Sequence, residues 1–366
     1  MKKIALLTLM LIASYFVAAC NGEPSNGAGN EDDGIFRVML LVNGNLGDRS
    51  FFDLAVEGIQ SLDAMEGIEA SYIEMGTDSS IWESTLRTVS QQNYDLIFVG
   101  TWQMSENLQR TANRYPNQRY VIFDSEVHED RNDEYDNVHS ILFNQSEAAF
   151  LAGYAAASLT ESLKIGFVGG QRIDTINDFA IGFIEGAEHY ASVHDTGFTV
   201  YTSYVGSFDN SALARSLAQT QYNNGVDIIF QAAAQAGLGV FDAAKATNNF
   251  VIGVDTDQYE YFIDDDPLKA SLIVTSVLKK VDHVIVDSAL AHMNDELEFG
   301  VLIRLGLSEG IVGLAKNDNY DTYITQINRD AIEALELAII DGSIVVSSAY
   351  DLETSAINAI LDRNRP

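Results

Sequence analysis

The strongest constraint on the fold is a regular alternation of short apolar runs with longer amphipathic stretches. The short runs are rich in β-branched and aromatic residues, whereas the longer stretches repeat apolar residues at the spacing of a helical face. The expected strands cover residues 36–42, 70–74, 96–99, 120–123, 138–143, 164–168, 199–204, 227–230 and 251–254. The expected helices cover residues 51–65, 81–91, 104–114, 146–163, 178–191, 211–223 and 237–246. Strands and helices that alternate in this way predict α/β units with parallel sheets.

Several of the expected strands are continuously apolar, as in the runs YVIF at 120–123 and DIIF at 227–230. Such strands are buried on both faces, which is typical of a parallel sheet covered by helices on both sides. The alternation starts again after residues 138–143, and the chain is too long for one ordinary core. The sequence therefore predicts two doubly wound α/β lobes in series.

Polar residues follow most of these strands. They are Asn43-Gly44-Asn45, Gly100-Thr101, Asp124-Ser125, Gly169-Gly170, Gln231 and Asp255-Thr256-Asp257. In doubly wound folds, ligands bind at the carboxyl ends of the strands. Two such lobes facing each other across a cleft would form a ligand clamp.

The first residues of the chain have the composition of a secretory signal. Lys2 and Lys3 precede an apolar run that ends in Val-Ala-Ala before Cys20, the only cysteine of the chain. The run is shorter than the roughly 20 residues of a membrane span. Its end resembles a bacterial lipobox, which would make Cys20 the lipidated first residue of the mature protein and anchor it to a membrane. An ordinary cleaved signal with an incidental cysteine is the alternative.

The expected domain order follows from composition. Residues 1–19 form the lipoprotein signal peptide, and residues 20–35 form a lipidated cysteine and a flexible tether rich in Gly, Asn, Ser and acids. No later apolar run is long enough to cross a bilayer. A single cysteine also leaves no disulfide and no thiolate metal site.

The chain carries a large excess of negative charge. It has 53 acidic and 21 basic residues, a formal net charge of −32. Such a surface repels nucleic acid and anionic lipid, which argues against a DNA-binding regulator. Adaptation to high salt and plain solubility both explain this charge, and the sequence does not choose between them.

Six short blocks occur in one order along the chain. They are residues 44–51 (GNLGDRSF), 150–154 (FLAGY), 165–170 (IGFVGG), 227–231 (DIIFQ) followed by the glycines of Gly237-Leu238-Gly239, 252–258 (IGVDTDQ) and 275–280 (TSVLKK). In these blocks the chain resembles the basic membrane protein family of substrate-binding lipoproteins, the purine nucleoside receptor A-like receptors of ABC importers.

The resemblance implies a periplasmic binding protein type I fold, with two Rossmann-like lobes, a hinge and an interlobe ligand cleft. The N-terminal lobe would comprise residues 36–142 plus 277–303, and the C-terminal lobe residues 143–276 plus 304–366. It implies a monomeric, membrane-anchored protein on the extracytoplasmic side that binds a purine nucleoside. Its partners would be the permease and ATPase of an ABC importer, and no cofactor or metal is implied.

The resemblance also assigns roles to individual residues. Phe51 and Phe230 would stack on the two faces of the base, and Asp255 and Lys279 would hold the ribose hydroxyls as an ion pair. From the residues alone, a core position is favoured for both phenylalanines. Asp255 is compatible with a helix or turn cap, and Lys279 with a solvated lysine, Lys280 being equally available for its role.

Three further residues belong to the expected site. Asp124 would accept hydrogen bonds from N–H groups of the base edge, since an ionised carboxylate only accepts. Asp48 matches a family acid and is expected to cap the helix that begins at Phe51. Gly237, with Gly239, would let a ligand approach the start of a helix. A plain strand-end cap remains the alternative for Asp124.

Two positions depart from the family pattern. Phe52 stands where the family usually has Asn, and Val42-Asn43 stands where it often has Asp before its glycines. These departures leave open a different ligand, such as a sugar, an autoinducer or another polar metabolite. A sensor ectodomain, an adhesin and a surface hydrolase acting on nucleosides are further alternatives.

An enzyme is the weaker interpretation. The sequence has no P-loop and no G-x-S-x-G elbow. Its six histidines are scattered and never at the H-x-x-x-H spacing of a metal site.

Overall fold

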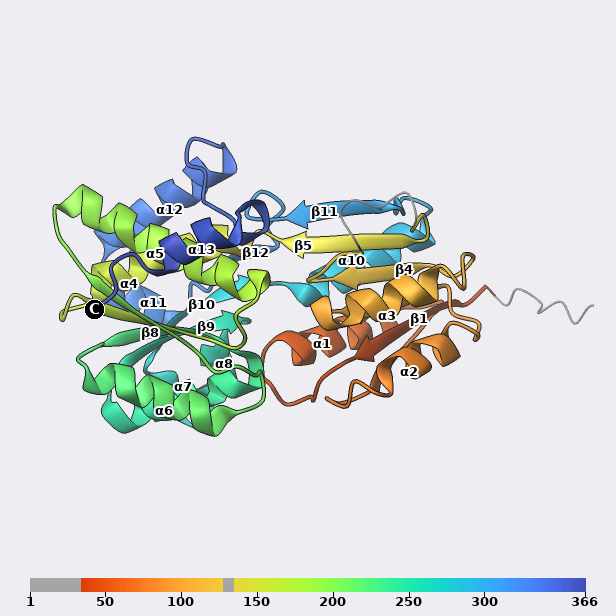
Figure 1. Ribbon diagram of the computed structural model, residues 1–366, viewed down its shortest axis with the longest axis horizontal. Helices are drawn as coiled ribbons and strands as arrows, with labels where there is room; N and C mark the ends of the chain where they lie inside the picture. Colours follow the sequence, from red (N-terminus) through yellow and green to blue (C-terminus); the bar gives the residue numbers. More distant parts are fainter. Residues whose placement is uncertain (1–33, 128–134) are drawn as a thin grey trace, which may run out of the picture. The chain divides into compact units, whose positions relative to one another are not determined.

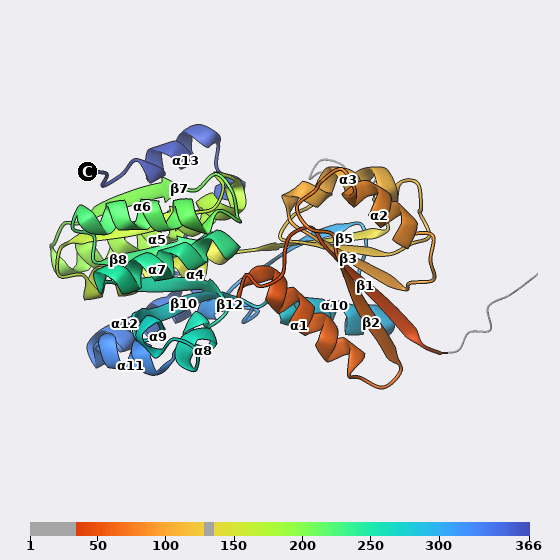
Figure 2. The same cartoon turned by 90° about the horizontal axis from the view of Figure 1, so that it is seen from below.

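Two six-stranded sheets form the framework of the chain in the computed structural model, which describes residues 34–127 and 135–366 (Figures 1 and 2). The predicted signal peptide, Cys20 and nearly all of the predicted tether lie outside the described residues. The first sheet has the order β11-β5-β4-β3-β1-β2, and its paired strands are all parallel. Its strands are β1 (Phe36–Val42), β2 (Ile68–Glu74), β3 (Leu96–Gly100), β4 (Tyr120–Phe123), β5 (Val138–Phe143) and β11 (Val301–Leu305).

The second sheet has the order β12-β10-β9-β8-β6-β7. Its strands are β6 (Lys164–Gly169), β7 (Thr199–Tyr204), β8 (Ile228–Ala232), β9 (Phe250–Asp255), β10 (Ile273–Lys279) and β12 (Val312–Leu314). The last strand pairs antiparallel with β10, and the other pairs are parallel.

Helices cover both faces of each sheet, as Figure 2 shows. Those beside the first sheet are α1 (Phe51–Asp63), α2 (Trp82–Val89), α3 (Trp102–Ala112) and α10 (Val281–Met293). Those of the other lobe are α4 (Gln145–Leu159), α5 (Asp174–His194), α6 (Ser211–Asn223), α7 (Ala234–Thr247), α8 (Gln258–Ile263), α9 (Pro267–Ala270), α11 (Asp318–Tyr323), α12 (Gln326–Ile340) and α13 (Thr354–Leu361), with a 3₁₀ turn at Ala349–Asp351. The predicted class, two doubly wound α/β lobes, is confirmed.

The chain passes between the two lobes three times. The crossings lie between β5 and α4, between β10 and α10, and between β11 and β12. They are joined pairwise, because the Asn144 amide donates to the Leu305 carbonyl and the Lys280 amide to the Ile311 carbonyl, both at 2.9 Å. Three adjacent hydrogen-bonded segments have the construction of a hinge. The lobe limits 36–142 plus 277–303 and 143–276 plus 304–366 stay a proposal. The predicted limit between residues 276 and 277 lies within β10, which belongs to the second sheet over its whole length.

The FLAGY block has a packing role. Gly153 lies in α4 where a Cβ atom would overlap the Phe183 carbonyl of α5, and Gly186 of α5 meets the Phe150 carbonyl in the same way. Close contact of the two helix backbones thus requires glycine at both positions. Among the described residues, no helix is both long enough and apolar enough to cross a bilayer.

Candidate ligand-binding site

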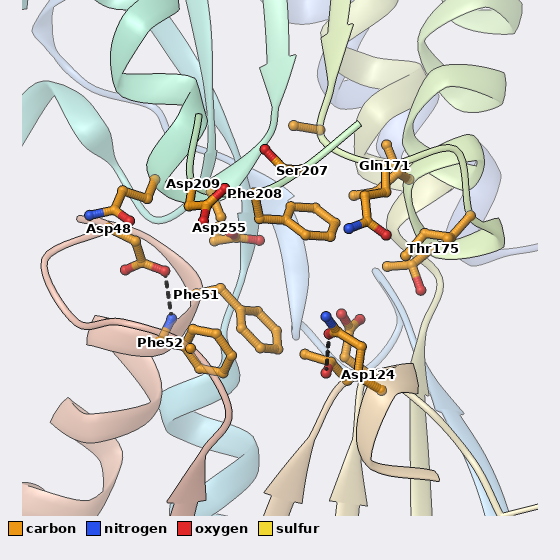
Figure 3. A pocket seen from close by; sticks show the side chains of 18 of the residues that line it. Asp48, Phe51, Phe52, Asp124, Gln171, Thr175, Ser207, Phe208, Asp209 and Asp255 are labelled. Carbon is orange, nitrogen blue, oxygen red and sulfur yellow. Dashed lines mark hydrogen bonds between the residues drawn. The ribbon is translucent and has the colours of Figure 1, made fainter. Parts of the chain in front are cut away.

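A cavity of about 300 Å³ lies where the carboxyl ends of the strands of both sheets meet (Figure 3). Residues that follow β1, β3 and β4 line it from the first sheet. Residues that follow β6, β7 and β8, together with the last two residues of β9, line it from the second. Lys279, the last residue of β10 and the start of a hinge crossing, completes the lining. The volume is at the lower end of the range for small-molecule sites.

The centre of the cavity is a buried group of two carboxylates and one ammonium. Lys279 Nζ lies 2.9 Å from Asp124 Oδ1 and 3.9 Å from Asp255 Oδ1. The three residues are 2%, 8% and 5% exposed, respectively. Burial raises the pKa of both Asp124 and Asp255, and the charge of Lys279 opposes that rise. The group therefore joins the end of β4 in one lobe to the end of β9 in the other, through a hinge residue.

Aromatic rings surround the same ammonium. Lys279 Nζ lies 4.8 Å from the ring centre of Phe51, 5.2 Å from that of Phe143 and 5.4 Å from that of Phe179. A cation within about 6 Å of an aromatic face is attracted by the ring electrons. The rings also exclude water from the ion pairs, which strengthens the electrostatic interactions inside the cavity.

The loop between β1 and α1 connects to the second lobe beside this group. The Ser50 hydroxyl donates to Asp255 Oδ2. Arg49 donates to the Tyr261 carbonyl at 2.9 Å and to Asp265 Oδ2 at 3.1 Å, and its own carbonyl accepts from Gln258 Nε2 at 3.1 Å. These bonds hold the lobes together along one side of the cleft.

Asp48 organises the start of α1, as predicted. Its carboxylate accepts from the amides of Ser50, Phe52 and Asp53 at 3.0, 3.0 and 3.2 Å. Burial raises the pKa of Asp48 to about 7 against the opposing effect of these donors, and nearby Asp53 adds to the rise. The capped turn fixes Phe51 at the cavity, where Figure 3 shows its ring.

A further aromatic ring of the cavity comes from Phe208. It lies in the loop between β7 and α6, and Figure 3 shows the rings of Phe51 and Phe208 entering the cavity from opposite lobes. The Phe208 ring covers Gly170, where a Cβ atom would overlap it. The site thus combines two opposed phenyl rings with a buried ionic group, an arrangement suited to a flat solute that also carries hydroxyl groups.

Comparison with known proteins identifies the family and the fold. A profile of the family described as ABC transporter substrate-binding protein PnrA-like matches residues 35–347. The chain belongs to this PnrA-like family. The ABC transporter nucleoside-binding protein BmpA of Lactococcus lactis subsp. cremoris is 31% identical over 366 residues, which are 95% of this chain and 100% of the relative. Basic membrane protein A of Borreliella burgdorferi is 30% identical over 346 residues, 94% of this chain and 95% of that protein.

A solved structure agrees with this assignment to the PnrA-like family. The solute-binding protein of an ABC transporter system from Aeropyrum pernix K1 superposes with a TM-score of 0.79 and 26% identity, covering 89% of this chain and 96% of that one. The predicted periplasmic binding protein type I fold is confirmed. As a PnrA-like protein, the chain is a substrate-binding component of an ABC transporter and not an enzyme. Its partners are a small-molecule ligand and the permease and ATPase of the transporter.

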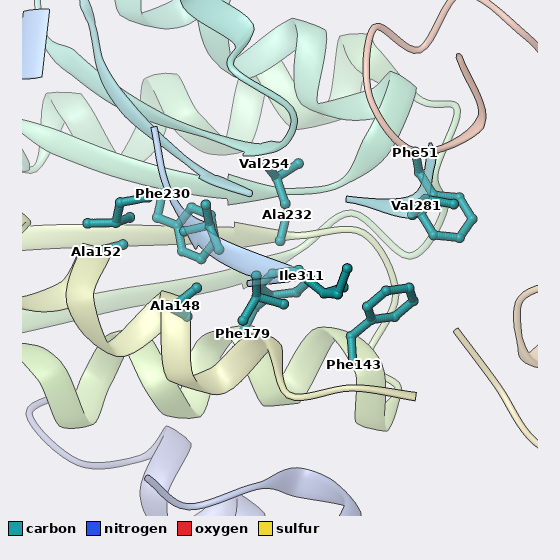
Figure 4. Packing of buried hydrophobic residues seen from close by; sticks show 14 of the residues in the cluster. Phe51, Phe143, Ala148, Ala152, Phe179, Phe230, Ala232, Val254, Val281 and Ile311 are labelled. Carbon is teal, nitrogen blue, oxygen red and sulfur yellow. The ribbon is translucent and has the colours of Figure 1, made fainter. Parts of the chain in front are cut away.

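Two residues predicted for the site lie elsewhere in this PnrA-like protein. Phe230 is fully buried in the core, with its ring centre 5.5 Å from those of Phe167 and Phe183 and 5.8 Å from that of Phe179 (Figure 4). It supports Phe179, which does line the cavity, but it is not among the lining residues itself. The prediction that Phe230 stacks on a ligand is therefore wrong, because the Phe230 side chain points from β8 toward Phe179 and Phe183 of α5.

Gly237 also has a packing role. It lies within the first turns of α7, where a Cβ atom would overlap the side chain of Gln231. Its neighbour Gly239 lets α7 approach the Ser211 carbonyl of α6. Neither glycine lines the cavity, so the expected ligand approach at Gly237 is wrong.

The sequence analysis missed several lining residues. Besides Phe208, they include Trp102, Gln103, Gln171, Thr175 and Gln235. The available signal was the position of Gly206-Ser207-Phe208-Asp209 in the loop after β7, at the same edge of the sheet as the other lining residues. The strand at 199–204 ends in Tyr204, and no polar residue directly after it marked the loop.

Proposed function

We propose that this PnrA-like protein binds a purine nucleoside in the cleft between its lobes and delivers it to an ABC importer. The observation that carries the proposal is the buried Asp124–Lys279–Asp255 group beside the opposed rings of Phe51 and Phe208. The nucleoside-binding protein of Lactococcus lactis, at 31% identity over its whole length, supports the same ligand class.

Each part of a nucleoside has a matching partner in the proposed complex. A purine is flat and stacks on aromatic rings, a contact that contributes about 1–3 kcal/mol per base. Asp255 accepts from ribose hydroxyls, and Lys279 donates to them. Asp124 accepts from N–H groups of the base. Because the polar partners sit at the hinge and on both lobes, a bound nucleoside stabilises the closed arrangement of the lobes.

The charge of the cavity favours an uncharged solute over a nucleotide. Within residues 34–127 and 135–366, the charged residues that line the cavity are Asp48, Asp124, Asp209 and Asp255 against Lys279 alone. A phosphate group would meet uncompensated carboxylates in a cavity of low dielectric, which disfavours its entry. The proposed ligand is therefore the nucleoside itself.

Isothermal titration calorimetry tests this function directly. We expect saturable heat at one ligand per chain for inosine, guanosine or adenosine, and none for ribose or inosine monophosphate. The full folded chain without its signal peptide is titrated in each case. Absence of heat with all three nucleosides would exclude the proposal. Displacement of a bound nucleoside by a free sugar would favour the sugar alternative, which the substitution of Asn43 for an acid motivates.

We also propose that Cys20 carries the lipid that anchors the protein to the cell membrane. Two acyl chains suffice for stable anchoring, at about 0.8 kcal/mol per buried methylene. In a Cys20→Ser variant expressed in a bacterium, we expect the protein to leave the membrane fraction completely. Western blots of membrane and soluble fractions measure this, with whole-cell blots as the control for expression. A Cys20→Ser protein that stays in the membrane fraction would contradict lipidation at this residue.

A further inference from the structure

A fully buried side-chain oxygen of the cavity lining lacks a hydrogen-bond partner in the part of the chain that the structure describes. The Asn43 side chain is only 4% exposed, lines the cavity, and its Oδ1 has no hydrogen-bond partner among the described residues. A buried acceptor without a donor is costly, so such atoms are rare unless a ligand or water completes them. The carboxylates nearby differ in this respect, because Lys279 pairs with Asp124 and Ser50 donates to Asp255.

Two neighbours fix the orientation of the Asn43 amide. Asn43 Nδ2 donates to Thr101 Oγ1 at 2.8 Å, and the Thr101 hydroxyl donates to Gln103 Oε1 at 2.9 Å. A hydroxyl has one proton, and Thr101 gives that proton to Gln103. Thr101 can therefore only accept from Asn43, which turns Nδ2 toward Thr101 and leaves Oδ1 unpaired.

The backbone holds this relay in an unusual position. Thr101 has φ 68° and ψ 156°, directly between β3 and α3. Positive φ is a rare conformation for a β-branched residue, and such outliers concentrate at ligand-binding sites. Its amide donates to the Phe123 carbonyl at 3.0 Å, next to Asp124. The relay and Asp124 thus share one edge of the first sheet, at the ends of the neighbouring strands β1, β3 and β4.

We infer that Asn43 is a specificity-determining residue whose Oδ1 accepts a hydrogen bond from an N–H group of the base, with Thr101 and Gln103 as positioning residues. The inference rests on the proposed nucleoside function, and it specifies the atom, Asn43 Oδ1, that recognises an N–H group of the base. Asn43 is neutral, so it reads an N–H donor without adding another negative charge beside Asp124. Nucleosides with an N–H on the six-membered ring or on its exocyclic amine satisfy the acceptor, and purine riboside, which has neither, leaves it unpaired.

A cycle of protein and ligand changes tests the inference. Affinities of inosine, adenosine and purine riboside are measured for the wild type and for Asn43→Val. We expect the wild type to bind inosine or adenosine at least tenfold more tightly than purine riboside. In Asn43→Val this preference should fall by at least threefold, and Asp124, which also accepts from base N–H groups, accounts for what remains. The affinity for purine riboside should change by less than about threefold, because that ligand gives Asn43 no donor.

Further variants separate recognition from folding. Thr101→Val removes the hydroxyl that orients the Asn43 amide while keeping the shape of the side chain. The preference for inosine or adenosine over purine riboside should therefore fall part of the way toward its value in Asn43→Val. Asn43→Asp keeps an acceptor in the same place and should retain a preference for N–H donors, which keeps the test decisive if Asn43→Val does not fold. Equal losses for purine riboside and inosine in Asn43→Val would overturn the inference. A wild type that binds no nucleoside at all would instead refute the proposed function.

Discussion

Replacing Lys279 with methionine is expected to abolish ligand binding and to lower the free energy of unfolding by about 3–5 kcal/mol. The ammonium lies 2.9 Å from Asp124 and 3.9 Å from Asp255, and all three side chains are buried. Without it, two carboxylates face each other in a cavity of low dielectric with no cation between them. Urea unfolding followed by circular dichroism measures the stability, and calorimetry with the wild-type ligand measures the binding.

The adjacent lysine is the matched control. Lys280 is half-buried and belongs to the same motif, and Lys280→Met should change the free energy of unfolding by about 1 kcal/mol or less. In the double variant Lys279→Met with Asp124→Asn, one of the unpaired charges is removed, so part of the lost stability should return. If Lys279→Met and Lys280→Met proved equally stable, the buried ionic group would not contribute the stability that we assign to it.

The choice between the two lysines shows what the sequence could not decide. The TSVLKK block offers both side by side, and successive residues of a strand point to opposite faces. A shift of one residue in the pairing of β10 would exchange their positions. The observed register aligns Val277 with Val254 and Leu278 with Asp255, and it is this long-range pairing that selects Lys279.

Asp124 and Asp255 were easier to predict because chemistry and topology agree there. Each directly follows or ends a continuously buried strand, and the carboxyl ends of parallel strands gather at one edge. Both have positive φ, 59° and 65°, a conformation that Asp adopts more readily than most residues. Turn chemistry, strand position and charge all point to the same place.

The relay around Asn43 was only partly visible in the sequence. The sequence places Val42-Asn43 where the family often has an acid, but the consequence depends on Thr101 and Gln103, which are far from Asn43 in sequence. The contact arises because β1 and β3 are neighbours in the sheet although β2 lies between them in the chain. Sequence patterns predict strands well, whereas the order of strands in the sheet brings together side chains that no local pattern links.

The aromatic residues give the clearest contrast between motif and structure. The DIIFQ block covers most of β8, which runs toward the cleft, and Phe230 is its bulkiest side chain. The strand is buried on both faces, so its two faces look alike in the sequence. In the structure Phe230 packs on Phe167, Phe179 and Phe183 under the cavity, while Phe208 enters the cavity from a loop.

Alanine substitutions of Phe208 and Phe230 should therefore affect different properties: the first mainly ligand binding, the second mainly the free energy of unfolding. Phe208→Ala removes a stacking surface and should weaken nucleoside binding by roughly ten- to hundredfold, corresponding to about 1–3 kcal/mol. The free energy of unfolding should fall by only about 1 kcal/mol or less, because the ring is half-buried in a loop. Phe230→Ala leaves a cavity in the core and should lower the free energy of unfolding by about 3–5 kcal/mol.

Calorimetry and urea unfolding on the same preparations separate the two roles. At a temperature where it remains folded, Phe230→Ala should bind with an affinity within about threefold of the wild type, because its effect on the cavity passes only through Phe179. Phe230→Leu fills more of the core space and provides a more stable variant for the same comparison. If a folded Phe230 variant lost binding while Phe208→Ala kept it, the stacking ring would be the one that the DIIFQ motif suggests, and the cleft would have to close differently around its ligand.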